Sequence, residues 1–331
     1  MMEKQMIAMI AVLLFAINGA EGEPLSQNDA ANAVQQADTA NQPRDRKNPD
    51  NTPPAEQQRK SPQSMSLGEK SDRPVSANKV NYFSIHQWPG NNNTQIKFQI
   101  SIKFRVLEPN LYVLKYNIFP AYVIYTQKSL WNVGRKSMPF EESNYNPEFF
   151  LDYPINAVIL GRFKLRNLVF SPIEHESNGL PGIQSRNWNR QYVLIRLGLE
   201  SKEKLETKNA FLSDKALLYV KLWRAVGYSD QDDYLHSIGK NNKFSDFMGR
   251  GEIGISIRNF LWRGSFRNHQ LDIKTPIFRD SSKNSYEFEF RQQVPNMNFA
   301  LYLQYWYGYG ETLMRFDRFG HRGFVGLSFS Y

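Results

Sequence analysis

The chain contains no cysteine, and after its first residues it has no long apolar run. Without cysteine, no disulfide framework holds the fold and no thiol chemistry is available. Without a second apolar run of about 20 residues, a helical membrane protein is excluded, in agreement with the mean hydropathy of −0.56. Basic clusters are also lacking. The net charge of +9 is scattered along the chain, which argues against nucleic-acid binding. If the chain forms a membrane barrel, for which the evidence follows, the basic residues are expected to line its lumen or to meet anionic head groups at its rim.

The beginning of the chain has the pattern of a secretory signal peptide. Lys4 precedes an apolar run over residues 6–17, which is too short to span a bilayer, and small residues follow around Ala20. We therefore expect residues 1–22 to be a signal peptide. Residues 23–79 are rich in Gln, Asn, Asp, Pro, Ser and Lys and poor in aromatic residues, which predicts a disordered, polar periplasmic linker.

From residue 80 onward, the chain alternates between strand-like segments and polar turns. The segments that can be delimited are 94–107, 112–125, 158–171, 188–200, 217–226, 252–263, 270–278, 286–293 and 299–307. At the C-terminus, apolar and small residues alternate up to a final aromatic residue, Tyr331. A terminal strand of this kind is typical of outer-membrane barrels, which have an even number of strands. We therefore predict one all-β domain over residues 80–331, with about a dozen strands.

The most informative stretch runs from Glu174 to Arg190 and reads EHESNGLPGIQSRNWNR. Residues two apart on a strand share a face, so His175 and Ser177 point the same way. Counted backward, that face carries apolar residues: Ile173, Val169, Leu165 and Phe163. The opposite face carries charged residues: Lys164, Arg166, Glu174 and Glu176.

After the loop, Asn189 lies in step with Val193, Ile195, Leu197 and Leu199. If the hairpin pairs symmetrically about Gly182, His175 lies opposite Asn189, within reach of its amide. His, Ser and Asn are the residue types of a hydrolytic triad, and all three fall on apolar faces. Such a face is buried in a soluble sheet or exposed to lipid in a membrane barrel. The two ends of the chain favour the barrel.

Five motifs resemble those of the outer-membrane phospholipase A family in order and approximate spacing. They are YTQKSLW at 125–131, NYNPE at 144–148, HESNG at 175–179, SRNWNR at 185–190 and GYGE at 308–311. The similarity extends from about residue 81 to the C-terminus. It implies a 12-stranded antiparallel transmembrane β-barrel in the bacterial outer membrane, with an active site that faces the outer leaflet. The implied activity is hydrolysis of acyl esters of phospholipids at the A1 and A2 positions, and of lysophospholipids.

The resemblance also implies roles for the hairpin residues. Ser177 would be the nucleophile, His175 the general base and acid, and Asn189 the residue that orients His175. In this family, formation of a homodimer switches activity on. Gln127 matches a polar residue at the flat dimer interface of the family.

Calcium is the cofactor that the resemblance implies, with one Ca²⁺ per subunit in the active dimer. By motif position, its ligands are the Ser185 hydroxyl, the Leu180 carbonyl and Ser137 from the partner subunit. Gly182 stands where many family members have Asp, so its carbonyl and a water would have to take the place of the carboxylate. Asp233 matches a second calcium site of the monomeric state.

Two alternatives belong to other classes of protein. One is a catalytically silent barrel that acts as a pore or adhesin, although 12 strands are few for an open channel. The other is a soluble secreted β-sandwich. Among the remaining residues, Trp188 and Tyr192 are expected inside the barrel or at its aromatic girdle, and His236, His269 and His321 are expected to be ordinary surface or loop residues.

Overall fold

The computed structural model describes residues 74–87, 94–107, 111–113, 116–161, 163–200, 214–228, 244–260 and 268–329. Most regular structure in these ranges is β-strand: β1 (Val75–Ser76), β2 (Asn81–Gln87), β3 (Thr94–Leu107), β4 (Leu111–Val113), β5 (Tyr116–Ile118), β6 (Ala121–Trp131), β7 (Phe140–Leu160), β8 (Phe163–Ser177), β9 (Asn187–Glu200), β10 (Asp214–Tyr228), β11 (Gly251–Arg258), β12 (His269–Ile277), β13 (Ser285–Gln293), β14 (Phe299–Gly308) and β15 (Gly320–Phe329). Helical elements are short: α3 (Phe244–Met248), η1 (Gly182–Gln184) and η2 (Ser281–Lys283). No helix in these ranges has the length and apolar character needed to cross a membrane.

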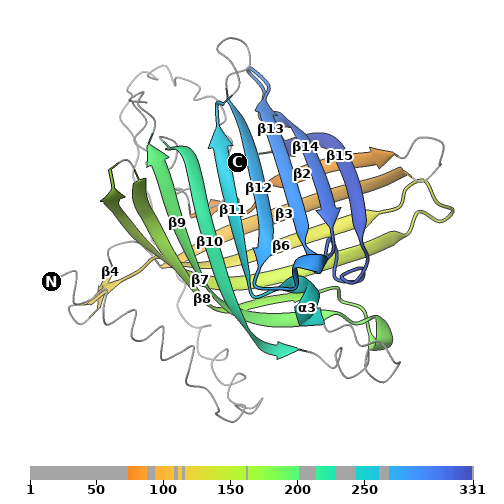
Figure 1. Ribbon diagram of the computed structural model, residues 1–331, viewed down its shortest axis with the longest axis horizontal. Coiled ribbons are helices and arrows are strands. Elements are labelled where there is room, and N and C mark those ends of the chain that lie inside the picture. The colour runs from red at the N-terminus through yellow and green to blue at the C-terminus, as the bar shows by residue number, and fades with distance from the viewer. Residues whose placement is uncertain are drawn as a thin grey trace, which may run out of the picture. The chain divides into compact units, whose positions relative to one another are not determined.

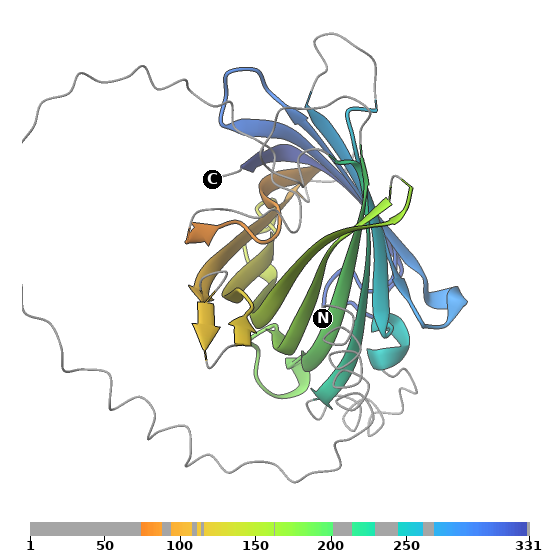
Figure 2. The ribbon, with the colours of Figure 1, turned by 90° about the vertical axis from the view of Figure 1, so that its left-hand side faces the viewer.

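Twelve strands close into an antiparallel barrel (Figure 1). Neighbours follow chain order from β6 to β15, β15 pairs with β2, and β3 pairs with both β2 and β6, which closes the ring. The short β1 adds to β3, and β4 and β5 form a separate hairpin. Figure 2 shows the strands of the wall running obliquely, the tilt that closure of a barrel requires. The predicted fold class is confirmed.

Most predicted strand boundaries agree with the structure. β3 spans the predicted range, and β9, β10, β12, β13 and β14 begin and end within about three residues of theirs. β2 and β7 could not be delimited from the sequence, and the segment predicted at 112–125 is divided between the β4–β5 hairpin and β6. The segment predicted at 158–171 is wrong, because it crosses the turn between β7 and β8 and stops six residues before β8 ends, and β11 ends five residues before the predicted 263. β7 contains Pro147 and Pro154 and several bulges. Both features interrupt the period-two alternation by which a strand is found.

The two faces of the wall differ in polarity, as the strand β14 illustrates. Leu301, Leu303 and Tyr305 point outward, with exposed fractions of 52%, 44% and 43%. Between them, Tyr302 and Gln304 point inward and are buried. Apolar side chains on the outside and polar ones on the inside are the pattern of a barrel that meets lipid.

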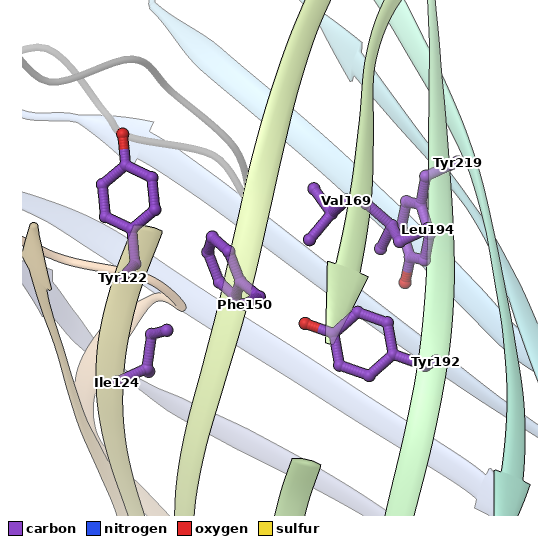
Figure 3. Close-up of a cluster of buried hydrophobic side chains, with 7 residues drawn as sticks. All are labelled: Tyr122, Ile124, Phe150, Val169, Tyr192, Leu194 and Tyr219. Atoms are coloured by element: carbon purple, nitrogen blue, oxygen red, sulfur yellow. The ribbon is translucent and has the colours of Figure 1, made fainter. Parts of the chain in front are cut away.

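The barrel interior combines an apolar cluster with buried ion pairs. The cluster lies against the wall from β6 to β10 (Figure 3) and contains Tyr122, Ile124, Phe150, Val169, Tyr192, Leu194 and Tyr219. The ion pairs include Lys97–Glu311, Arg190–Glu174, Lys221–Glu174 and Arg291–Asp272. Basic residues therefore line the lumen, one of the two locations expected for the excess positive charge, and Tyr192 lies inside as predicted.

The ordered barrel begins earlier than the sequence predicted. Residues 74–79 were assigned to the disordered linker, but β1 pairs with Phe104 and Lys103 of β3, and Ala77 and Asn78 are buried. These six residues carry few apolar side chains, so composition gave no sign that backbone pairing would hold them. The rest of the linker and the signal peptide lie outside the described residues.

A loop and a helix lie at one mouth of the barrel. The mouth loop, residues 309–319, connects β14 to β15. Its Glu311 pairs with Lys97 of β3 at 3.1 Å, and its Met314 N–H donates to Glu142 of β7 at 3.1 Å. The loop therefore reaches strands well beyond its own. It also packs against α3 in an aromatic cluster: Trp188, Phe244, Phe247, Leu313 and Phe316.

The directions of the strands show at which end of the barrel this mouth lies. The barrel strands alternate in direction from β2 to β15, so β2 begins and β15 ends at one end of the barrel. The β6–β7, β8–β9 and β14–β15 connections all lie at the other, which we call the far end. The predicted active-site hairpin thus stands at the same end as the mouth loop and α3.

Candidate active site

His175 and Asn189 face each other across β8 and β9. The register pairs His175 with Asn189 and Ser177 with Asn187, which confirms the predicted symmetry about Gly182. His175 Nδ1 lies 2.8 Å from Asn189 Oδ1. An amide oxygen can only accept, so with this amide orientation Nδ1 carries the proton and Nε2 remains as the basic nitrogen.

The three side chains lie on the outer face of the wall, near the far end. His175, Ser177 and Asn189 are each half-buried, and the neighbouring Ile173 on the same face is 54% exposed. Tyr145 of β7 lies in register with Ser177. Ser177 is therefore approached from the outer side of the wall and not from the lumen.

Two bulges in β8 correct one part of the predicted face. The register between β8 and β9 shifts between Leu165 and Asn167 and again between Ser171 and Glu174. Between the shifts the faces are exchanged, so Val169 points into the lumen with 1% exposure and not outward with His175. Each bulge adds one residue and reverses the alternation. The second restores it, which is why the outward positions of the triad residues were nevertheless predicted correctly.

Charged residues occupy the inner face of the same hairpin. Glu174 is 1% exposed and binds Arg190 Nη2 and Lys221 Nζ, each at 2.8 Å. Arg190 Nη2 also binds Glu176 at 3.0 Å, and its guanidinium lies 3.8 Å from the ring centre of Trp188. In register terms, Glu174 pairs with Arg190 and Glu176 with Trp188, alternating with the outward His175–Asn189 pair. We call Glu174, Glu176, Trp188 and Arg190 the inner clamp.

Asn178 organises the loop between the two strands. Its side-chain Nδ2 donates to the Gln184 carbonyl at 2.7 Å, and its Oδ1 accepts from the N–H groups of Leu180 and Arg186. Its own N–H donates to the Arg186 carbonyl at 2.9 Å. The first amide after Ser177 is therefore already engaged.

The ligands expected for the calcium ion of the dimer lie at the far end, without a carboxylate among them. Ser185 is half-buried and Leu180 is 37% exposed; within the described ranges, the Ser185 hydroxyl and the Leu180 carbonyl have no hydrogen-bond partner. Gly182 has φ +59 and its carbonyl accepts from the Ser185 N–H at 2.9 Å. Ser137 is exposed in the β6–β7 loop with φ 67. Asp233 lies outside the described residues.

The chemical types of these expected ligands suit calcium, because neutral hydroxyl and carbonyl oxygens are ligands that Ca²⁺ accepts. The described ranges contain no group of three or more His, Cys, Asp or Glu side chains that could hold a metal ion. The ligands expected at this loop are neutral oxygens, with the Gly182 carbonyl in the place of a carboxylate. Affinity for Ca²⁺ falls with the charge of its ligands, so a site made of these groups alone would be weak.

Other sequence expectations can now be compared with the structure. Trp188 is 2% exposed and lies inside, as predicted. His269 was expected at the surface or in a loop, which is wrong: it begins β12, is 2% exposed, and its ring lies 4.9 Å from that of Phe260. A single polar residue in a turn-rich region carries no periodic signal, so burial there is decided by packing. His321 is exposed, although in β15 and not in a loop, and His236 lies outside the described residues.

Comparison with known proteins identifies the family. The sequence profile of the family described as phospholipase A1 matches residues 63–330. The chain belongs to the phospholipase A1 family. A putative phospholipase A1 of Neisseria meningitidis is 25% identical over 238 residues, which cover 71% of this chain and 54% of that protein. The chain thus spans about half the length of that relative. The phospholipase A1 of Escherichia coli K12 is 26% identical over 240 residues, covering 70% of this chain and 68% of the relative.

Solved structures share the barrel. Outer membrane phospholipase A from Escherichia coli aligns with a TM-score of 0.61 and 24% identity, over 78% of this chain and 94% of that one. The Salmonella typhi outer membrane phospholipase, solved as a dimer with bound calcium, aligns with a TM-score of 0.60 and 23% identity, over 78% and 93%. The family and the lipid-facing barrel place the protein in the bacterial outer membrane, as predicted, and in a family of phospholipid ester hydrolases.

Sequence reasoning missed the residues behind the triad. Arg190 and Asn146 had each appeared only within a motif, without a role. A signal was present in each case. Charged residues alternate with the triad residues along the hairpin, and Pro147 in a strand that is not at an edge marks a place where ladder bonding fails.

Proposed function

We propose that the protein is a calcium-dependent phospholipase that cleaves acyl esters of phospholipids at the A1 and A2 positions, and of lysophospholipids. Ser177 is the nucleophile, His175 the general base and acid, and Asn189 the residue that orients His175. The observation that carries the proposal is the 2.8 Å contact between His175 Nδ1 and Asn189 Oδ1, on the outer face of the barrel.

The reaction follows from the tautomer that Asn189 selects. With the proton on Nδ1, His175 Nε2 takes the Ser177 hydroxyl proton as the oxygen attacks the ester carbonyl. Collapse of the tetrahedral intermediate breaks the ester bond, and the imidazolium gives its proton to the departing lysolipid alkoxide. Water then hydrolyses the acyl-enzyme by the same route, and a fatty acid leaves.

The tetrahedral oxyanion needs donors close to Ser177. The Asn178 N–H is already bonded to the Arg186 carbonyl, so the next amide, at Gly179, is the first that remains for the oxyanion. Gly179 has φ +65, and a Cβ there would lie 2.9 Å from the Tyr145 ring. Only glycine fits this position without strain, which keeps the amide where a substrate oxygen can approach.

Calcium would be held by the Ser185 hydroxyl, the Leu180 carbonyl and Ser137 of the partner subunit, with one ion per subunit in the dimer. When bound, it would supply positive charge to the oxyanion. The Gly182 carbonyl and a water take the place of a carboxylate, so we expect half-maximal activity at millimolar rather than micromolar calcium. Asp233 remains our candidate for a second site of the monomer.

A homodimer through the β6 wall agrees with the position of Gln127. This polar side chain points outward, and Ile100, which lies in register with it on β3, is 47% exposed. The Gln127 side-chain oxygen accepts a hydrogen bond from the Tyr125 hydroxyl, and its amide nitrogen donates to the Ser129 hydroxyl, each at 3.2 Å. A polar group in a lipid-facing wall favours contact with another polar group. In such a dimer, the β6–β7 loop of the partner would supply Ser137 to the calcium site.

The pore alternative has an observation against it. The mouth loop binds Lys97 and Glu142 across the far end, and its Phe316 packs on Phe244 and Phe247 of α3. A passive channel needs an open mouth, whereas the loop at this mouth is tied to β3 and β7 and packed against α3. The adhesin form of the alternative is decided by the activity test.

The test is release of fatty acid from mixed phospholipid and detergent micelles by the purified protein, with calcium and with excess chelator. Wild type should be active with calcium only, and Ser177→Ala should lose about a thousandfold or more in kcat. Ser328→Ala, a buried serine on β15 away from the hairpin, is the matched control. Full activity in chelator would contradict the metal assignment, and absence of release from folded wild type would favour a silent barrel.

Dimerisation is tested by cross-linking in membranes. Calcium and substrate that bind only the dimer shift the equilibrium toward it. Cross-linked dimer should therefore increase with calcium and when phospholipid enters the outer leaflet. An unchanged dimer fraction under both conditions would exclude this switch.

A further inference from the structure

The hydrogen-bond ladder between β7 and β8 is interrupted behind the triad histidine. Pairs are formed at Tyr145↔Ser177 and at Glu148↔Glu174, but not at the two positions between them. The intact pairs on either side place Pro147 opposite His175. Proline has no N–H to donate, so the His175 carbonyl cannot receive its usual ladder bond from β7.

Asn146 supplies that bond from its side chain. Its Nδ2 donates to the His175 carbonyl at 2.7 Å, and Asn146 is only 4% exposed, on the lumen side. A carbonyl left without a donor in a nonaqueous wall is destabilising, because the buried acceptor loses the water that it binds in the unfolded chain. The side chain of one residue therefore replaces the backbone donor that the next residue lacks.

Lys79 fixes the orientation of this amide. Lys79 Nζ donates to Asn146 Oδ1 at 2.8 Å, which leaves Asn146 Nδ2 directed at His175. The Lys79 backbone N–H is itself held by the Ser101 hydroxyl at 3.1 Å. Lys79 stands just before β2, where the N-terminal segment enters the barrel. Four residues thus form a continuous series of hydrogen bonds from that entry point to the backbone of His175.

We propose that Asn146 is a positioning residue for His175, and that Lys79 holds Asn146 in the donating orientation. Asn146 touches neither the substrate nor the reacting atoms. It keeps the β8 backbone at His175 in register with β7, so that the imidazole stays aligned between Asn189 and Ser177. The kinetic consequences of this inference rest on the proposed function. The effect of Asn146 on the β8 backbone does not depend on that function.

The kinetic test compares Asn146→Ala with the double variant Asn146→Ala/Pro147→Ala. The single variant removes the donor, and kcat should fall about 10-fold to 100-fold with KM nearly unchanged, because misplacement of a reacting group acts on the chemical step. The second change restores a backbone N–H opposite His175. It should recover most of the lost kcat, which a role of Asn146 in packing alone would not predict.

Two further variants sharpen the kinetic test. Lys79→Met should show a smaller loss of kcat than Asn146→Ala, since the amide remains but loses its fixed orientation. Asn167→Ala is the matched control: Asn167 is 1% exposed on the lumen side and donates to Asp152 at 2.6 Å, away from the triad. It should lower barrel stability without changing kcat.

Hydrogen–deuterium exchange of the peptide that contains His175 gives a readout independent of activity. Exchange there should rise in Asn146→Ala and return toward wild type in the double variant. If wild type releases no fatty acid, the proposed function fails while exchange still decides this inference. If wild type is active, unchanged exchange and unchanged kcat in Asn146→Ala would overturn it, as would failure of Pro147→Ala to restore either.

Discussion

The two faces of the β8–β9 hairpin have opposite characters. The outer face carries the polar groups His175, Ser177 and Asn189, with the contact between His175 and Asn189. The inner face carries the clamp, in which the buried Glu174 is held between Arg190 and Lys221. The strands are the same, so the difference reflects the medium on each side.

This contrast explains why an amide and not a carboxylate faces the histidine. A charged side chain on the lipid side of a barrel is costly, by an amount that depends on its depth, whereas an ion pair in the lumen is compensated by its partners. In the proposed mechanism, Asn189 orients the imidazole without placing a charge in the wall, although it does not offset the imidazolium charge as a carboxylate would. The inner clamp supplies rigidity from the side where charges are tolerated.

The largest expected effect comes from breaking the inner clamp. Arg190→Ala leaves Glu174 and Glu176 without their shared partner, and loss of one member of a buried pair costs about 3–5 kcal/mol. Unfolding of the barrel in detergent, followed by the gel shift of heated samples, should show this loss. Arg318→Ala, at an exposed position of the mouth loop, is the control. A clamp variant as stable as that control would mean that the inner face does not support the hairpin.

Next in size is the change on the outer face at Asn189. Asn189→Ala removes the acceptor for His175 Nδ1, and kcat should fall on the order of a hundredfold while barrel stability changes little. Asn189→Asp keeps an acceptor and adds a charge, so it should retain far more activity than the alanine variant. Equal loss in both variants would show that orientation of the ring is not the role of this residue.

A smaller effect is expected from adding a charge to the loop. Gly182→Asp introduces a carboxylate beside the proposed calcium ligands; a Cβ there meets no atom within 4 Å, and Asp tolerates a left-handed backbone better than most residues. We expect about a tenfold lower calcium concentration for half-maximal activity, because affinity rises with ligand charge. Gly161→Asp is the control, since Gly161 has φ +55 and equally open surroundings. The same shift in both variants would point to surface charge alone.

The smallest effect concerns pH at the mouth loop. Burial alone would raise the pKa of Glu311, but the charges of Lys97 and Arg322 outweigh it and hold the pKa below its usual value. A lowered pKa means that the stabilisation is present above the ordinary carboxyl range and is lost as the pH falls through the lowered value. The protection of residues 309–319 from hydrogen exchange, taken relative to the intrinsic rate at each pH, should therefore fall on acidification. In Glu311→Gln this protection should be low at every pH. A pH-dependent change in protection that persists there would assign the effect to another group.

Much of the outer face was predictable from the sequence. Alternation placed His175, Ser177 and Asn189 on one face, and the turn centred on Gly182 gave the correct register. Alternation also located most of the second half of the barrel. These features depend on a strand's own period, so they can be found without knowing what packs against it.

The inner face was less predictable, because it depends on which strands meet. Whether Glu174 binds Lys221, or Asn146 reaches the His175 carbonyl, is decided by residues that lie 47 and 29 positions apart in the chain. The two bulges in β8 and the burial of His269 also left no sign in a single sequence. Each of these is the outcome of packing between distant segments.

The sequence by itself determined the class of fold, the three residues proposed as the triad and the side of the wall on which they stand, because the alternation of side chains along a strand is a local property. Only the tertiary structure decided how the triad is held: the closed ring brought Lys79 to Asn146, and the mouth loop to Glu142. Those contacts join segments that are distant in the chain. Their geometry exists only once the barrel has closed.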